Sequence, residues 1–81
     1  MAKSFHLTIA KIGENLFDGQ ATAVTLPGKE GAFEVLAGHE PLISQLKAGT
    51  IRLTAEGGEK RELAIEGGVA EISHDQATVV L

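Results

Sequence analysis

The sequence predicts a single all-β domain. Three observations predict it: apolar residues recur at every second position, turns containing glycine or proline separate these runs at short intervals, and no stretch keeps a helical period beyond one turn. A period of two is the pattern of a strand with one buried face. Short strands joined by regular turns are typical of a sandwich or barrel. The 81 residues leave room for one core, so residues 1–81 are expected to form one domain.

The alternating runs are the predicted strands. In the first, Phe5, Leu7 and Ile9 alternate with His, Thr and Ala. The other runs place two apolar residues on either side of a single residue, and they are Val24 and Leu26, Phe33 and Val35, Ile51 and Leu53, Leu63 and Ile65, and Val79 and Leu81. Because Val80 is apolar as well, we expect the last run to be buried on both faces.

Turn residues separate the predicted strands. Pro27 and Gly28 suit the two central positions of a type II turn, since proline presets φ and glycine accepts a positive φ. Residues 56–59 (Glu-Gly-Gly-Glu) predict a hairpin tip. The two glycines at 67–68 predict a bulge or a sharp corner at which the backbone approaches another segment. Residues 73–76 (Ser-His-Asp-Gln) predict the final turn.

One stretch, residues 41–49, is ambiguous. Its apolar residues Leu42, Ile43 and Leu46 have the spacing i, i+1, i+4, which a single helical turn would satisfy. Such a turn is too short to be stable alone, so no long helix is expected anywhere in the chain.

The composition narrows the classes of function. Among Phe, Tyr and Trp the chain has only three phenylalanines, which leaves little for base stacking. Its formal net charge of −4 disfavours binding to a phosphate backbone, so no nucleic-acid partner is expected. The absence of cysteine excludes disulfides and thiolate zinc sites and fits a reducing compartment. Polar residues interrupt residues 1–11 before a signal peptide could form, and no apolar run is long enough to span a membrane. We therefore expect no direct membrane insertion.

The common catalytic patterns are missing from the sequence. Gly28 and Lys29 are followed by Glu30 and lack the first glycine of a phosphate-binding loop. No serine lies in a nucleophile elbow, and the histidines, which are His6, His39 and His74, lack the spacing of metal ligands. We expect no catalysis, no cofactor and no metal ion.

The order of turn residues and apolar residues is more specific than the chemistry. Residues 26–43 read LPGKEGAFEVLAGHEPLI, and this segment resembles the epsilon subunits of F-type ATP synthases. The resemblance continues through residues 17–19 (FDG), 46–52 (LKAGTIR), 66–72 (EGGVAEI) and 77–81 (ATVVL). It covers nearly the whole chain.

The resemblance implies a fold and a function. The implied fold is a flattened β-sandwich of about ten short strands. The implied function is that of a non-catalytic subunit of the central stalk, or rotor, of a proton-translocating ATP synthase. In that role the chain binds the gamma subunit, lies against the c-ring and helps to couple proton flow to ATP synthesis. It is associated with the cytoplasmic face of the bacterial inner membrane through the complex.

Two departures from the family pattern matter. Many relatives have glutamate at the position of Ala32, where it is associated with the c-ring. Glu30 or Glu34 could take its place, because alternation in an extended segment would direct both to the same side as Ala32. Family members also continue into two C-terminal helices that regulate ATP hydrolysis, and the resemblance here ends at Leu81, so that regulation is not expected from these residues.

A candidate partner-binding loop lies in the middle of the chain and comprises Gly38, His39, Glu40, Pro41 and Leu42. Binding residues concentrate on loops held by a rigid sheet. Gly38 permits a tight backbone turn, and Pro41 restricts both its own φ and the residue before it. The resemblance places His39 on the side that faces the rotor. The alternative is that His39 only caps the turn.

Two other functions compete with this hypothesis. One is a lipoyl or biotinyl carrier domain, which is also an all-β unit of this size with a lysine on a hairpin. Lys60 follows the glycine pair at 57–58, but it lies between Glu59 and Arg61 and not between the neighbours of a carrier lysine. The other is a generic protein-binding or ligand-binding β-sandwich.

Overall fold

The structure is a computed structural model that describes residues 3–81. Met1 and Ala2, the start of the segment judged above for a signal peptide, lie outside the described residues. The described part contains six strands and no helix, and the strands are β1 (Phe5–Lys11), β2 (Glu14–Gly28), β3 (Gly31–Leu36), β4 (Leu42–Ala55), β5 (Lys60–Ile72) and β6 (Gln76–Val80). Within this range there is no helix with the length and apolar character needed to cross a bilayer.

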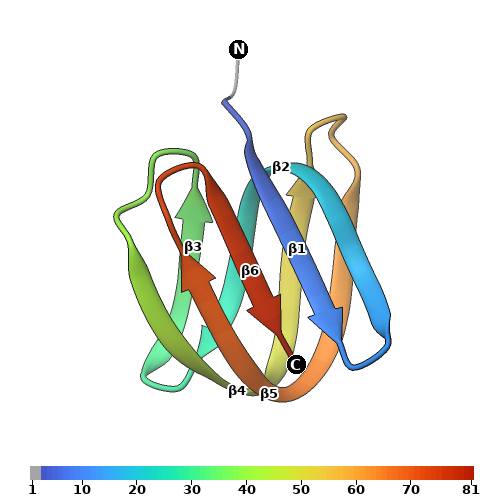
Figure 1. Cartoon of the computed structure of the whole chain (residues 1–81), viewed down its shortest axis with the longest axis vertical. Coiled ribbons are helices and arrows are strands. Elements are labelled where there is room, and N and C mark those ends of the chain that lie inside the picture. The colour runs from blue at the N-terminus through green and yellow to red at the C-terminus, as the bar shows by residue number, and fades with distance from the viewer. Residues whose placement is uncertain (1–2) are drawn as a thin grey trace.

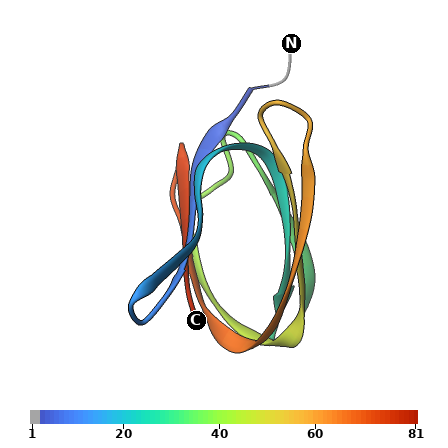
Figure 2. The same cartoon turned by 90° about the vertical axis from the view of Figure 1, so that its right-hand side faces the viewer.

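The strands form two layers packed face to face (Figures 1 and 2). The sheet order is β1-β6-β5-β4-β2-β3, and an additional pairing between β1 and β2 brings the sheet back onto itself. One layer holds β1, β6, the first halves of β2 and β4 and the second half of β5. The other layer holds β3, the second halves of β2 and β4 and the first half of β5. The predicted all-β, flattened sandwich is confirmed.

The strand count differs from the ten short strands that the resemblance implies. Residues 3–81 form six strands, because β2, β4 and β5 are 15, 14 and 13 residues long and bend from one layer into the other. Figure 2 shows these bends at both ends of the oval cross-section. Each long strand therefore contributes to both layers, so a count of short straight segments overestimates the number of strands.

The core lies between the layers and is formed by the predicted alternation. Phe5, Leu7 and Ile9 of β1 are buried, and the inward residues of the other strands join them in one cluster. Val80 is an exception, because its exposed fraction is 57% while Val79 is fully buried. The expectation that the last strand is buried on both faces is therefore wrong, since β6 lies in a layer with one solvent-facing side.

Pro27 and Gly28 end β2 and do not form the predicted turn, whose tip is Lys29 and Glu30. The register between β2 and β4 shifts between Thr25 and Gly28, so the missing N–H of Pro27 falls where the ladder is already interrupted. Gly28 has a packing role instead. A Cβ atom there would lie 2.6 Å from the Gly31 carbonyl oxygen and against the Phe33 ring.

Residues 42–46 form the start of β4 and not a helical turn. Leu46 is buried and Leu42 is half-buried, whereas Ile43 points to solvent. This alternation has period two, and pairing with β5 begins at once, with Leu42 opposite Ile72. The ladder therefore overrides the local spacing that suggested a helix.

The other predicted turns are confirmed. Residues 56–59 connect β4 to β5, and residues 73–75 connect β5 to β6. Gly67 and Gly68 form the predicted corner, with φ values of +151° and +152°. A Cβ at Gly68 would lie 2.6 Å from the Val80 carbonyl oxygen, so the close approach expected from the sequence is present.

We predict that Gly68→Ala lowers the free energy of unfolding by roughly 2–4 kcal/mol, because the added methyl group meets a backbone oxygen and the positive φ disfavours alanine. Denaturant unfolding measures this change. The matched control is Gly57→Ala at the hairpin tip, where an added Cβ meets nothing within 4 Å. Equal stability of the two variants would contradict the role assigned to the corner.

Candidate partner-binding site

The candidate loop joins β3 to β4 and lies beside the β5–β6 turn (Figure 1). Gly38 has a φ of +83°, which confirms the turning role expected for this glycine. Its N–H donates to the His74 carbonyl oxygen at 3.1 Å, and the N–H of His39 donates to the Leu36 carbonyl oxygen at 3.2 Å. Backbone hydrogen bonds thus hold the loop both to the end of β3 and to the neighbouring turn.

The His39 side chain is half-buried within this loop. Its Nδ1 donates to the carbonyl oxygen of Glu40 at 2.7 Å, which is the contact expected from a histidine that caps a turn. Among the side-chain hydrogen bonds of the described residues, none involves its Nε2. The capping contact fixes the orientation of the ring and leaves one ring nitrogen for a partner.

The rest of the predicted loop is divided between solvent and core. Glu40 and Pro41 are exposed. Leu42 is half-buried against the core, so its side chain anchors the loop more than it offers a contact. The next residue, Ile43, is the exposed apolar residue of this segment, with an exposed fraction of 71%.

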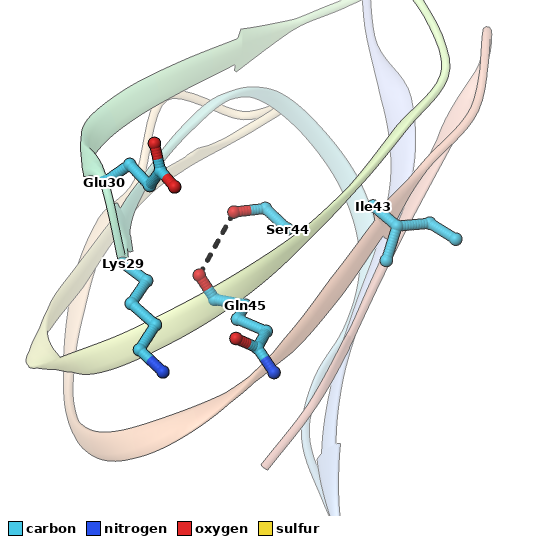
Figure 3. Close-up of a pocket in the computed structure, with 5 residues that line it drawn as sticks. All are labelled: Lys29, Glu30, Ile43, Ser44 and Gln45. Carbon is cyan, nitrogen blue, oxygen red and sulfur yellow. Dashed lines mark hydrogen bonds between the residues drawn. The ribbon is translucent and has the colours of Figure 1, made fainter.

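The two acidic candidates lie in different places. Glu34 and Ala32 are exposed on β3 two positions apart, as alternation predicts, but Glu30 lies in the turn before this strand. Lys29 and Glu30 line one side of an open hollow of about 260 Å³, and residues of β4 line the other side (Figure 3). The Lys29 N–H donates to the Gln45 carbonyl oxygen at 2.8 Å across this hollow. Glu30 therefore lies near the segment that follows the loop, whereas Glu34 lies midway along β3.

The structure adds an apolar surface that the sequence did not reveal. Ile43, Val69 and Val80 have exposed fractions of 71%, 43% and 57% on the outer face of the layer that contains β1 and β6. Val69 pairs with Val80 and is diagonal to Ile43 across the β4–β5 ladder, and the exposed Glu71 lies directly opposite Ile43. The three apolar side chains thus form a patch with a carboxylate beside it, which we call the valine–isoleucine face. Their outward positions follow from strand pairing, which the sequence alone does not specify.

The opposite outer face is largely polar, although Leu36 at the end of β3 is 51% exposed there. Arg52 donates from Nε to Glu62 at 3.0 Å, and both side chains are largely exposed. Thr25 pairs with Glu34 and with Arg52, which extends the polar row across β3, β2 and β4. The face with three exposed apolar side chains is therefore the candidate surface for contact with another macromolecule.

Outside the candidate site, the ionisable side chains of residues 3–81 include an exposed ion pair between His6 and Asp18. No group of three or more His, Cys, Asp or Glu side chains in this range could hold a metal ion. Lys60, the carrier-type lysine considered above, is an exposed residue at the start of β5.

These features define a class, namely a small β-sandwich domain with an apolar outer face next to an ordered loop. The chain belongs to the ATP synthase delta/epsilon chain beta-sandwich domain family, whose model matches residues 4–81. It is 38% identical over 77 residues to an ATP synthase epsilon chain of a Bradyrhizobium species and 36% identical over 78 residues to that of Chlorobium limicola. These alignments cover 95% and 96% of the chain, and 56% and 89% of the two relatives.

Solved structures show the same fold. A chain of the Euglena gracilis mitochondrial ATP synthase OSCP/F1/c-ring structure superposes with a TM-score of 0.88 at 30% identity, over 95% of this chain and 49% of that one. A chain of the Tetrahymena thermophila mitochondrial ATP synthase central stalk/c-ring structure gives a TM-score of 0.76 at 12% identity, over 98% of this chain and 63% of that one, and supports the fold alone.

We predict that the chain neither hydrolyses ATP nor binds MgATP with a dissociation constant below about 1 mM, which corresponds to roughly −4 kcal/mol. Gly28 is paired at the end of β2 and the Lys29 N–H donates to the Gln45 carbonyl oxygen, so this segment does not present the free backbone N–H groups of a phosphate-binding loop. Calorimetric titration with MgATP measures this. A saturable heat of binding in the micromolar range would refute the prediction.

Proposed function

We propose that this chain is a non-catalytic subunit of the central stalk, or rotor, of a proton-translocating F-type ATP synthase. In this role it binds the gamma subunit and lies against the c-ring, so that proton flow is coupled to ATP synthesis. Membership of the delta/epsilon chain family supports the proposal, as does the likeness to a chain from an ATP synthase structure that includes F1 and the c-ring. The chain spans about half the length of some of these relatives, so the proposal concerns the β-sandwich part of such a subunit.

The single observation that carries the proposal is the valine–isoleucine face beside the ordered loop. The apolar side chains on it are not needed for the core, which is filled by their inward neighbours such as Leu46, Ala70 and Val79. Burying such side chains against a partner contributes about 25 cal/mol per Å² of apolar surface removed from water. We assign the gamma subunit to this face and to the loop with His39.

The c-ring contact is assigned to the other end of β3. Glu30 lies in the β2–β3 turn, and the candidate loop lies at the opposite end of the same strand, so the two can face different partners. Of the two acidic residues that could replace the glutamate of relatives, Glu30 therefore suits the c-ring better than Glu34.

The complex places the chain at a membrane without inserting it. The curated relatives come from bacteria, which supports a peripheral position on the cytoplasmic face of a bacterial inner membrane. Attachment to the membrane then depends on the gamma subunit and the c-ring.

We predict that His39→Glu and Ile43→Asp each weaken binding to the purified gamma subunit by about 1–2 kcal/mol or more, because each variant brings a charge into the interface. Calorimetry or biolayer interferometry measures the affinity. Stability should change by about 0.5 kcal/mol or less for Ile43→Asp, since the side chain is already exposed.

The matched control is Ile12→Asp. Ile12 is fully exposed at the tip of the β1–β2 hairpin, which lies at the opposite end of the molecule from the loop (Figure 1), so this variant should bind like the wild type. Unchanged affinity of both test variants would refute the proposed face. A lower thermal midpoint of His39→Glu with unchanged affinity would show that His39 serves only the turn.

A further inference from the structure

The outer edge of β3 has no neighbouring strand in residues 3–81. β3 ends the sheet order and pairs with β2 alone. β4 begins close by, but the backbone bonds near it are confined to the two ends of β3: Lys29 N–H to the Gln45 carbonyl at one end and His39 N–H to the Leu36 carbonyl at the other. Between these ends the described residues form no backbone hydrogen bond from β3 to β4.

The register shows which backbone groups are free. Gly28 and Gly31 pair on either side of a two-residue turn, so Phe33 and Val35 direct their N–H and C=O groups toward β2. The intervening residues Ala32, Glu34 and Leu36 direct theirs away from β2. The bond that the Leu36 carbonyl accepts from outside the ladder agrees with this direction.

Natural sheets usually block such an edge with lysine, proline or a bulge. Residues 31–36 contain neither lysine nor proline, and the β2–β3 register has no irregularity. The side chains at Ala32 and Glu34 are exposed on the polar outer face and do not cover the edge. The edge is therefore a straight, unblocked row of backbone donors and acceptors.

The charge along this edge specifies what it can bind. Glu34 lies at its centre, with Glu30 and Glu40 beyond its two ends, and none of the three takes part in the ion pairs of the described residues. If a second copy of this chain paired antiparallel about the centre of the strand, Glu34 would lie directly opposite its own counterpart, which is unfavourable. A partner strand that carries Lys or Arg is favoured instead.

We propose that β3 accepts an extended basic segment of the gamma subunit as an added strand, bound through the N–H and C=O groups of Ala32 and Glu34 and the N–H of Leu36. This proposal rests on the proposed function, and it identifies β3 as the strand beside which the gamma subunit adds its own. β3 leads directly into the loop with His39, so the added strand is continuous with the gamma-binding surface proposed above. Backbone hydrogen bonds provide the affinity in this binding mode, and the acidic side chains select a basic partner.

The decisive variant is Glu34→Pro, which removes the central free N–H while leaving the bonds of Phe33 and Val35 to β2. Proline is tolerated on an edge strand when its N–H side faces solvent. The matched control is Glu34→Ala, which removes the charge but keeps the N–H. We expect Glu34→Pro to weaken binding to the gamma subunit at least about tenfold, and Glu34→Ala only a few-fold, with a smaller dependence on salt than the wild type.

Hydrogen exchange of the wild-type chain supplies a second readout that does not depend on how the proline variant folds. In the free chain the amides of Ala32, Glu34 and Leu36 should exchange fast, and those of Phe33 and Val35 slowly. In the complex with the gamma subunit the three fast amides should become protected by about tenfold or more, the protection that a ladder hydrogen bond gives.

The outcomes separate the two proposals. If the wild type binds the gamma subunit while the Ala32 and Glu34 amides stay unprotected, or while a folded Glu34→Pro binds as tightly as Glu34→Ala, the added strand is refuted. A homodimer that protects the same amides in the absence of gamma would also refute it. A wild-type chain that does not bind the gamma subunit at all would refute the proposed function instead.

Discussion

Close backbone contact at the bends of the long strands is the constraint on which the rest of the structure depends. A chain of 81 residues closes a two-layer core with six strands only because β2, β4 and β5 each bend from one layer to the other. At the bends, Gly68 lies against the Val80 carbonyl and Gly49 lies against the Pro27 ring, where a Cβ would come within 2.6 and 2.8 Å of its neighbour. Any larger residue at these positions would have to displace the neighbouring strand, β6 at Gly68 and β2 at Gly49, and disturb the packing of the core beneath them.

The same bends determine the chemistry of the surface. A strand that passes through both layers keeps its inward residues in the core throughout, so its outward residues are divided between two faces. In β4 the outward Ile43 lies on one face and the outward Arg52 on the other, where Arg52 pairs with Glu62. The apolar character of one face and the polar character of the other thus arise from where each strand bends, and the loop with His39 lies where β4 enters the apolar layer.

Sequence reasoning succeeded where the local pattern determines the structure. The alternation of Phe5, Leu7 and Ile9 and the glycines at 67–68 predicted buried strand faces and a corner, and both are present. It failed where the pairing between strands determines the structure. Pro27 looked like a turn residue, but an interrupted register accommodates it within β2, and Ile43 looked helical until the β5 ladder placed it outward. The turn at Gly38 between β3 and β4 follows from the local pattern, whereas the valine–isoleucine face and the open edge of β3 require the sheet order, which no local pattern contains.

A domain of this size has little interior to devote to an enclosed binding pocket, because nearly all of its inward apolar residues are needed for the core. Its capacity to bind therefore lies in outer faces and edges. Surfaces built on paired strands lose little conformational entropy on association, since their backbone is already ordered. In the role proposed above, the domain must also transmit torque without deforming. An interface that combines an apolar sheet face with a backbone ladder along β3 would meet both requirements, because it joins two rigid sheets and does not rely on flexible side chains alone.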